Sequence, residues 1–441
     1  MNIPEKTKIK ITIVIELYKR EMVSVLLLKI ELEKRGYQVE IKRKSEDISI
    51  SACDMLIIPN GYRTSGYLDY RYRFNCVSGK MMNLQWEQLS SRYEEKNNKW
   101  TSEGEAKKLV YLCWGENRIK QLSEVGVKKK NLEIVGPIHT DVMREQFDYV
   151  WYSRNEISKC YNIDKTKNWL LFISSLTFAS QKSVFMNSAK KLIDYIDYNE
   201  RQVTEEKTQK EIINWLIKAC ADDDNLIVIY RPHPTEVNSP ALEKARRSGG
   251  DRFRIISDLD LKQWIKVSNV LLLWNSTSAI ECCMSGKKCI ILRPYELNKN
   301  EEYILYDDAV MAKTYSEFCE QLYNDMHEFP IKKNMLDEYY DIKNEPTYIR
   351  ICNIVEKVLR DDSYKHYEKK FHIKRMVYLV RRGIILKLFF KWVYCFLFKH
   401  IGFKIRNNKI RERFFVDSWE NSVVERENAK KMERLIVRGW K

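Results

Sequence analysis

The sequence predicts an α/β protein with two Rossmann-like domains, a cleft between them, and a basic helical C-terminal extension. Three observations lead to this fold class. Short apolar segments alternate with helix-like segments over residues 8–141, a polar stretch near 152–168 interrupts them, and the alternation resumes over 168–294. Alternating strands and helices form parallel sheets that are covered on both faces. We therefore assign domains to residues 1–150, 151–345 and 346–441.

The N-terminal half contains strand-like segments separated by helical ones. The predicted strands cover residues 8–16, 37–42, 54–61, 80–88, 108–115 and 131–141. The first predicted helix, residues 21–36, ends at Gly36, because glycine commonly stops a helix. A second helix follows the strand that ends at residue 115.

The C-terminal half repeats the pattern. Its predicted strands cover residues 168–176, 226–230, 252–256, 269–274 and 288–294, and a long helical region ends near Cys220. We expect ligands beyond the carboxyl ends of these strands, which is where open parallel sheets bind them.

The composition limits the compartment and the partners. The formal net charge of +16 favours an anionic partner, which is nucleic acid, a phosphorylated substrate or an acidic membrane surface. Eleven cysteines without a regular framework indicate a reducing compartment, so we expect a cytoplasmic protein. Charges within the first apolar stretch argue against a signal peptide, and no uncharged run reaches about 18 residues, so no transmembrane helix is expected.

The first candidate site follows the strand 226–230, where the chain continues Arg231-Pro232-His233-Pro234. The prolines restrict the backbone of this turn. A stiff loop that carries an arginine and a histidine suits a phosphate group. The alternative is a tight turn with a solvated histidine.

The second candidate site lies between the strand 269–274 and the next helix. It contains Asn275, Ser276, Thr277 and Ser278, with Glu281 one turn further on. Free N–H groups at a helix start bind anions, and hydroxyl groups add donors. Simple helix capping is the alternative, although one serine would suffice for that. Glu281 would close a capping box or bind a ribose hydroxyl.

Together these motifs resemble those of a known enzyme family. R-P-H-P after a strand, then N-S-T-S-A-I-E and G-K-K-C-I-I-L-R-P, resembles glycosyltransferases of the two-domain GT-B fold. The nearest enzymes of this kind act in bacterial capsule and surface-carbohydrate synthesis: the Kdo and sialic acid transferases that use CMP-sugars, and the CDP-glycerol transferases of teichoic acid synthesis. L-Q-W-E-Q, C-W-G-E-N and V-G-P-I-H-T-D in the N-terminal half are similar as well. The resemblance covers residues 8–345.

The resemblance implies a metal-independent transfer from a nucleotide-sugar, with a CMP-sugar favoured, to a surface polysaccharide or lipid-linked glycan. Arg231, His233, Asn275, Ser276, Thr277, Ser278 and Glu281 would bind the donor in the second domain, and the first domain would bind the acceptor. Preorganised donors stabilise the charge that develops on the leaving phosphate. No cofactor is expected.

The acceptor hydroxyl needs a base on the opposite face of the cleft. Glu87 is the first candidate, with Glu116 and Asp141 in reserve, and His139 would lie on an interdomain loop. No glycine occurs in residues 16–21, where many GT-B enzymes have a glycine-rich loop. Gly61 and Gly66 would then supply part of the acceptor cleft.

A metal site is the rival reading of Asp258-Leu259-Asp260, which has D-x-D spacing. The segment precedes a predicted helix, so we expect one aspartate to cap that helix instead. No metal is therefore expected.

The extension holds a second anionic-partner candidate. Residues 371–411 contain eleven Lys or Arg residues, many aromatic residues and no Asp or Glu, which suits an acidic membrane surface. Arg381, Arg382, Lys387 and Lys391 do not share one helical face, so a two-helix arrangement or a buried partner surface stays open. No nucleic-acid motif is present, and no nucleic-acid partner is expected.

Three other functions stay open beside glycosyl transfer. They are a CDP-glycerol-type glycerophosphotransferase, a nucleotide-sugar epimerase of the same architecture, and a non-catalytic scaffold of a polysaccharide-synthesis complex. All would keep the fold, so the site has to separate them.

Overall fold

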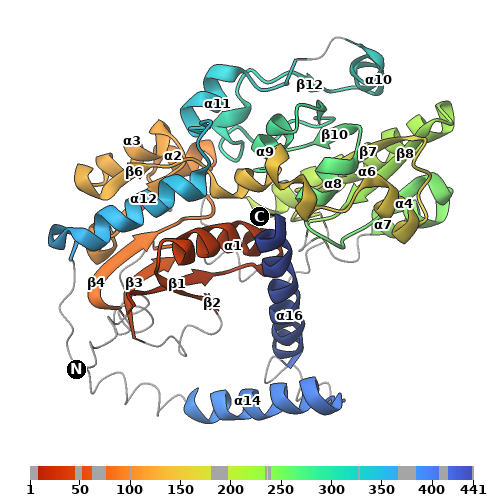
Figure 1. Cartoon of the computed structure of the whole chain (residues 1–441). Helices are drawn as coiled ribbons and strands as arrows, with labels where there is room; N and C mark the ends of the chain where they lie inside the picture. The colour runs from red at the N-terminus through yellow and green to blue at the C-terminus, as the bar shows by residue number, and fades with distance from the viewer. Residues whose placement is uncertain are drawn as a thin grey trace, which may run out of the picture.

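The predicted fold class is confirmed by the computed structural model, which describes residues 8–44, 52–61, 76–99, 102–179, 197–233, 236, 240–325, 328–365, 384–406 and 416–439. Two six-stranded sheets lie side by side, each between layers of helices (Figure 1). All strand pairs within them are parallel.

The N-terminal sheet has the strand order β2-β1-β3-β4-β5-β6. Its elements, in chain order, are β1 (Lys10–Ile15), α1 (Tyr18–Lys34), β2 (Gln38–Arg43), β3 (Cys53–Ile58), β4 (Cys76–Asn83), α2 (Arg92–Lys96), β5 (Val110–Cys113), α3 (Glu116–Glu124) and β6 (Leu132–Ile134). Along β1, Ile11 and Ile13 enter the core on one face of the sheet while Val14 enters the core on the other. This alternation explains why the strands read as continuous apolar runs.

Two 3₁₀ turns, η5 (Ile138–Met143) and η6 (Glu145–Val150), lead into the C-terminal domain, whose strand order is β12-β11-β10-β7-β8-β9. Its elements are α4 (Arg154–Tyr161), β7 (Asn168–Ile173), α6 (Tyr198–Asp222), β8 (Leu226–Arg231), α7 (Pro240–Ser248), β9 (Phe253–Ile255), α8 (Leu261–Val267), β10 (Val270–Leu273), α9 (Ala279–Met284), β11 (Lys288–Leu292), β12 (Met311–Ala312), α10 (Tyr315–Tyr323) and α11 (Lys333–Tyr339). Among the described strands, only the two-residue β12 was not predicted, and helix α4 lies in the stretch near 152–168 that was described only as a polar interruption.

After α11 the backbone returns to the N-terminal domain and passes closely over two glycines. The amide of Asp341 donates to the carbonyl of Trp114 at 2.7 Å. A Cβ atom on Gly115 would lie 2.6 Å from the carbonyl oxygen of Glu338, and one on Gly136 would lie 2.6 Å from that of Asp341. The C-W-G and V-G-P segments therefore make room for the returning chain.

The next helix, α12 (Thr347–Arg360), packs on α1 of the N-terminal domain. Ile351, Val355 and Val358 are fully buried in the same core cluster as β1. Asp141 holds the start of α12, because its two carboxylate oxygens accept the amides of Thr347 at 2.9 Å and Tyr348 at 2.7 Å.

The predicted helical extension is also present. Helix α16 (Val416–Gly439) packs on α1, and Lys29 forms an ion pair with Glu433 there. Helix α14 (Ile384–Ile401) lies apart from both sheets and contacts α16 (Figure 1). None of the helices in the described part of the chain has the length and apolar character needed to cross a membrane.

Gly136→Ala tests the role of the return crossing, with Gly36→Ala as a matched control. Both glycines have positive φ, +81° and +93°, but nothing lies within 4 Å of a Cβ on Gly36. The control should cost about 1–2 kcal/mol of unfolding free energy because of its backbone conformation. Gly136→Ala should cost at least about 2 kcal/mol more, because its Cβ overlaps the Asp341 carbonyl. Equal losses in urea unfolding would show that the crossing tolerates displacement.

Candidate functional site

Three neighbouring strands of the C-terminal sheet place the candidate donor residues at one edge. β7 lies between β10 and β8. Arg231 and His233 follow β8, Asn275 to Ser278 follow β10, and Ser174 and Ser175 follow β7 between them. Because adjacent strands are about 4.8 Å apart, the two predicted loops start about 10 Å apart, with the serines in the middle.

Buried polar atoms without a hydrogen-bond partner gather at this edge. Among the described residues they include Ser175 Oγ, Asn275 Oδ1 and Glu281 Oε2. Buried polar groups in native proteins nearly always have a partner, so unpaired ones require an explanation. A hydroxyl-rich or phosphate-bearing ligand would supply the missing donors and acceptors.

The polar residues before α9 form an ordered turn. The Ser276 amide donates to the Tyr306 hydroxyl at 3.0 Å, and that hydroxyl donates back to the Ser276 carbonyl at 2.7 Å. Ser276 Oγ accepts the amide of Ser278 at 3.2 Å. Ser278 is the N-cap of α9 but makes no side-chain cap hydrogen bond, so the capping box suggested for Glu281 does not form. Thr277 and Ser278 are half-buried.

Glu281 instead approaches His139 of the N-terminal domain. Its Oε1 lies 3.7 Å from Nε2 of His139, and both side chains are 9% exposed. Burial raises the pKa of Glu281 to about 7, although Lys262 lowers it. Burial, with Lys262 and Arg20, lowers the pKa of His139, which is therefore neutral at pH 7. The carboxyl group can thus accept or donate a hydrogen bond near neutral pH.

The loop after β8 is held by a buried carboxylate. Glu236 Oε2 accepts the amide of His233 at 3.0 Å, and the amide of Glu236 donates to the His233 carbonyl at 2.8 Å. Oε1 accepts the Tyr230 hydroxyl at 2.6 Å and the Gln209 amide at 2.5 Å. His233 is half-buried, and burial lowers its pKa. Pro234 lies outside the described residues.

Arg231 is already engaged with the neighbouring loop. Its Nη1 and Nη2 donate to the carbonyls of Asp258 and Leu259, both at 2.6 Å. Leu259 has a positive φ of 62°, which a leucine seldom adopts, so Arg231 stabilises an unfavourable turn. Asp260 caps α8 by accepting the Lys262 amide at 2.9 Å, which confirms the capping interpretation of the D-x-D sequence.

In the N-terminal domain, Glu87 follows β4 and pairs with Arg20 at the start of α1. Arg20 Nη1 donates to Glu87 Oε1 at 2.5 Å, and Nη2 donates to the buried Glu21 at 2.7 Å. The Glu87 side chain keeps 43% of its surface exposed to solvent. The surrounding protein atoms raise its pKa, while the charge of Arg20 lowers it. Glu87 also interacts electrostatically with Glu281.

The reserve candidates lie elsewhere. Glu116 is exposed at the start of α3, and both carboxylate oxygens of Asp141 accept backbone amides at the start of α12. The carbonyl of Gly61 accepts the buried Tyr111 hydroxyl, and a Cβ there would lie 2.6 Å from Leu109, so Gly61 serves core packing. Gly66 lies outside the described residues. No cluster of three or more metal-ligating side chains occurs in the part of the chain that is described.

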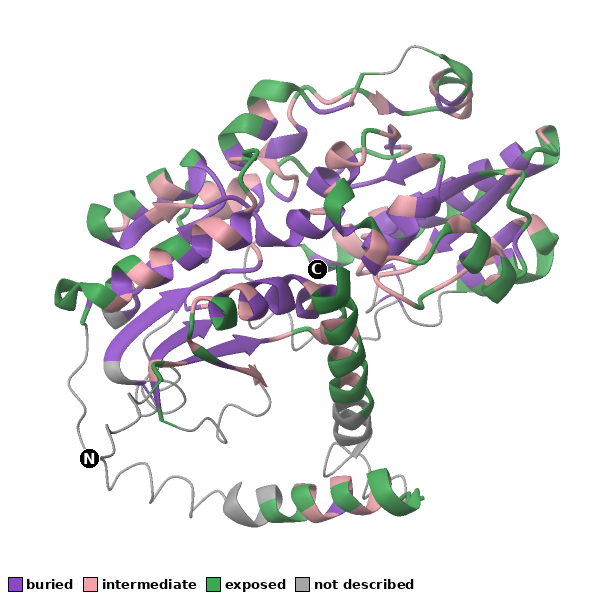
Figure 2. Ribbon diagram, in the orientation of Figure 1, coloured by how far each residue is buried: buried purple, intermediate pink, exposed green. Residues whose placement is uncertain are grey.

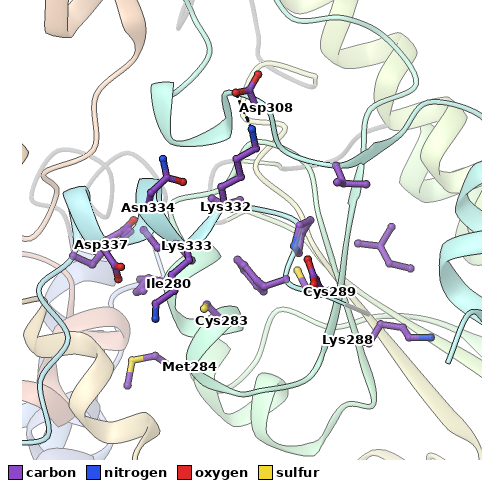
Figure 3. A pocket seen from close by; sticks show the side chains of 18 of the residues that line it. Ile280, Cys283, Met284, Lys288, Cys289, Asp308, Lys332, Lys333, Asn334 and Asp337 are labelled. Carbon is purple, nitrogen blue, oxygen red and sulfur yellow. Dashed lines mark hydrogen bonds and ion pairs between the residues drawn. The ribbon is translucent and has the colours of Figure 1, made fainter. Parts of the chain in front are cut away.

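A cavity of about 930 Å³ lies beyond α9, on the side of β11 and α11 (Figure 3). Ile280, Cys283 and Met284 line one wall, and the Asp308–Lys332 ion pair at 3.1 Å spans part of the rim. None of the residues predicted to bind the donor lines this cavity. Tyr340 also lines it, so the cavity borders the interdomain site on the side of α11.

Sequence reasoning missed several residues of the site. Tyr340, whose hydroxyl is buried without a partner among the described residues, stacks on Trp114 and interacts electrostatically with Glu281. Nothing in the sequence near Tyr340 predicts this. Ser175 and Arg20 were detectable, because Ser175 lies at the end of the predicted strand 168–176 and Arg20 follows the predicted strand 8–16.

Comparison with solved structures shows the fold. TagF, a wall teichoic acid polymerase, in a variant soaked with CDPG, has a TM-score of 0.52 and 12% identity over 80% of this chain and 89% of that one. The UDP-GlcNAc 2-epimerase of Neisseria meningitidis, bound to UDP-GlcNAc, has a TM-score of 0.50 and 10% identity over 80% of this chain and 100% of that one. The S. aureus MnaA–UDP structure has a TM-score of 0.51 and 13% identity over 80% of this chain and 97% of that one.

These enzymes have the GT-B arrangement of two Rossmann-like domains, and this chain shares it. At 10–13% identity the likeness concerns the fold alone. No family model matches the chain, and a search of curated proteins found no match.

The raised pKa of Glu281 predicts a pH-dependent stability. With a folded pKa of about 7 against an ordinary value of 4.5, the folded state binds the extra proton between these pH values. The resulting stability, on the order of 3 kcal/mol, is present below pH 4.5 and lost as pH rises through 7. Relative to wild type, Glu281→Gln should therefore be more stable at pH 8 than at pH 5. The variant Glu243→Gln, at an exposed position, should show no such trend. If the melting temperatures of wild type and Glu281→Gln changed equally with pH, the raised pKa of Glu281 would be refuted.

Proposed function

We propose that this protein transfers a sugar from a nucleotide-sugar donor, with a CMP-sugar favoured, to a surface polysaccharide or lipid-linked glycan. The observation that carries the proposal is the set of unpaired buried polar atoms at the carboxyl edge of the C-terminal sheet, Ser175 Oγ, Asn275 Oδ1 and Glu281 Oε2. Structural neighbours bound to UDP, UDP-GlcNAc and CDPG support a nucleotide-linked ligand. The eleven cysteines without a regular framework support action in a reducing compartment, and we place the reaction at the inner face of the cell membrane.

The donor would lie along this edge. Glu281 would accept ribose hydroxyls through its unpaired oxygen, and the backbone N–H of Thr277 with the hydroxyls of Thr277 and Ser278 would meet the phosphate beside His233. Arg231 would contribute charge while its two terminal nitrogens hold the Asp258–Leu259 turn. Fixed donors aimed at the leaving phosphate stabilise its growing charge. This arrangement assigns no step to a metal ion.

Transfer then requires a base on the facing domain. The bond between the sugar carbon and the phosphate oxygen breaks, and its electron pair leaves with the nucleotide. The acceptor oxygen bonds to the sugar carbon as its proton passes to Glu87. Arg20 orients the Glu87 carboxylate through the 2.5 Å contact, and the raised pKa strengthens the base.

The CDP-glycerol-type phosphotransferase is the second candidate, and the likeness to TagF favours it. There the acceptor attacks phosphorus, and His233 would stabilise the phosphoryl group. Activity with CDP-glycerol and a phosphodiester in the product, seen by ³¹P NMR, would identify this reaction. An epimerase would instead convert the donor with no acceptor present, and a scaffold would bind no nucleotide.

A thermal-shift screen with CMP, CDP, UDP and GDP is the direct test of donor binding. A ligand that binds only the folded state raises the melting temperature. We expect a cytidine nucleotide to do so for wild type and to lose the effect with His233→Ala. His400→Ala, on distant α14, is the matched control. Failure of every nucleotide to shift the melting temperature would favour the scaffold.

Glu87→Gln separates chemistry from binding. Loss of a general base should lower kcat by about 10²–10⁴, while the nucleotide-induced thermal shift remains. Glu116→Gln, on the exposed start of α3, should leave both unchanged. Retention of full activity in Glu87→Gln would exclude Glu87 as the base, without bearing on the donor site.

A further inference from the structure

Helix α14 carries a row of exposed aromatic side chains. Phe389, Trp392 and Phe396 are 62%, 68% and 53% exposed. Their spacing of three and four residues places them on one helical face. The ring centroids stack 6.5 Å and 6.2 Å apart along the row. An exposed aromatic surface of this kind marks an interaction site.

The opposite side of the helix is already packed. Tyr394 is buried, and its ring contacts Phe398 and Phe403 at centroid distances of 6.3 Å and 6.2 Å. Its hydroxyl accepts the amide of Ile405 at 3.3 Å, which folds the segment after α14 back onto the helix. The side that carries Tyr394 is therefore packed, whereas the aromatic row is exposed.

The positive charge of the segment indicates that its partner is anionic. Residues 384–406 contain five Lys or Arg residues and no Asp or Glu. At 3.6 residues per turn, Lys399 lies about 20° from Trp392 around the helix, beside the aromatic row, whereas Lys391 lies about 100° from Trp392. Lys399 also pairs with Glu427 of α16 at 3.2 Å. Arg381 and Arg382, which broke the periodicity in the sequence, precede the helix and lie outside the described residues.

The helix is also presented away from the rest of the protein. Figure 1 shows α14 at the far end of α16, and Figure 2 shows its green and pink surface, in contrast to the buried strands. At 1.5 Å per residue, the 24 residues of α16 span about 36 Å. Its C-terminal end packs on the N-terminal domain, where the Tyr149 hydroxyl donates to the Ile436 carbonyl at 3.3 Å.

We propose that α14 lies in the plane of an anionic lipid surface, with Phe389, Trp392 and Phe396 inserted at the level of the headgroups. Lysines beside the aromatic row would reach the acidic lipid headgroups with their long side chains. A protein groove could take the aromatic row, but the wholly basic character of the segment favours an acidic surface. This binding site is separate from the donor site and does not depend on the proposed reaction.

The test uses the full chain and flotation with vesicles of phosphatidylcholine alone or with 30% phosphatidylglycerol (about one anionic lipid in three). We expect binding to the anionic vesicles to exceed binding to neutral ones at least tenfold, and to weaken in about 0.5 M salt. The Phe389→Gln/Trp392→Gln/Phe396→Gln variant should bind the anionic vesicles at least tenfold more weakly than wild type. Lys391→Gln/Lys404→Gln should weaken binding to the anionic vesicles alone.

Matched controls change exposed residues on the two-domain body: Tyr152→Gln/Val203→Gln/Val310→Gln for the aromatic row, and Lys207→Gln/Lys244→Gln for the lysines. Both should bind as wild type does. Because α14 makes few contacts with the sheets, the triple variant should keep the wild-type melting temperature. Undiminished vesicle binding by the triple variant would overturn the proposal. A loss of self-association with unchanged vesicle binding would do the same, by assigning the face to a second copy.

Discussion

The relative position of the two domains depends on the backbone that returns over Gly115 and Gly136. Close-packed backbone atoms leave no room for sliding, since a single added carbon on either glycine would fall 2.6 Å from a carbonyl. The same crossing leads directly into α12, which Asp141 fixes to the N-terminal domain. The 3.7 Å approach of His139 to Glu281 is therefore a product of packing outside the site.

The site itself is less well satisfied than its surroundings. Both carboxylate oxygens of Glu236 accept hydrogen bonds that order the loop of His233, and the Tyr306 hydroxyl forms two hydrogen bonds with the backbone of Ser276. In contrast, Glu281 keeps one buried oxygen unpaired and holds a proton with a pKa of about 7. Such strongly shifted groups cluster where proteins bind and transform ligands. The stability of the packed cores on either side offsets the free-energy cost of burying Glu281.

Much of the fold could be predicted because parallel strands buried on both faces are unbroken apolar runs, as at β7, β8 and β10. Ser276 and Glu281 were also predictable, since a residue that follows such a strand must lie at the ligand edge. The structure adds what only tertiary contacts decide. Arg231 binds two carbonyls of a neighbouring turn, and Tyr340 reaches the cleft from a segment more than a hundred residues from β8.

The interface between the domains also affects how ligands enter and leave. Leu89, Trp114 and Met143 come from the N-terminal half, yet they are buried in a core cluster of the C-terminal domain. At about 1.5 kcal/mol or more for each buried side chain, a hinge opening that exposed all three would cost about 5 kcal/mol. Only about one molecule in several thousand would then be open at equilibrium. Ligands that exchange through the loops at the sheet edge would avoid this cost.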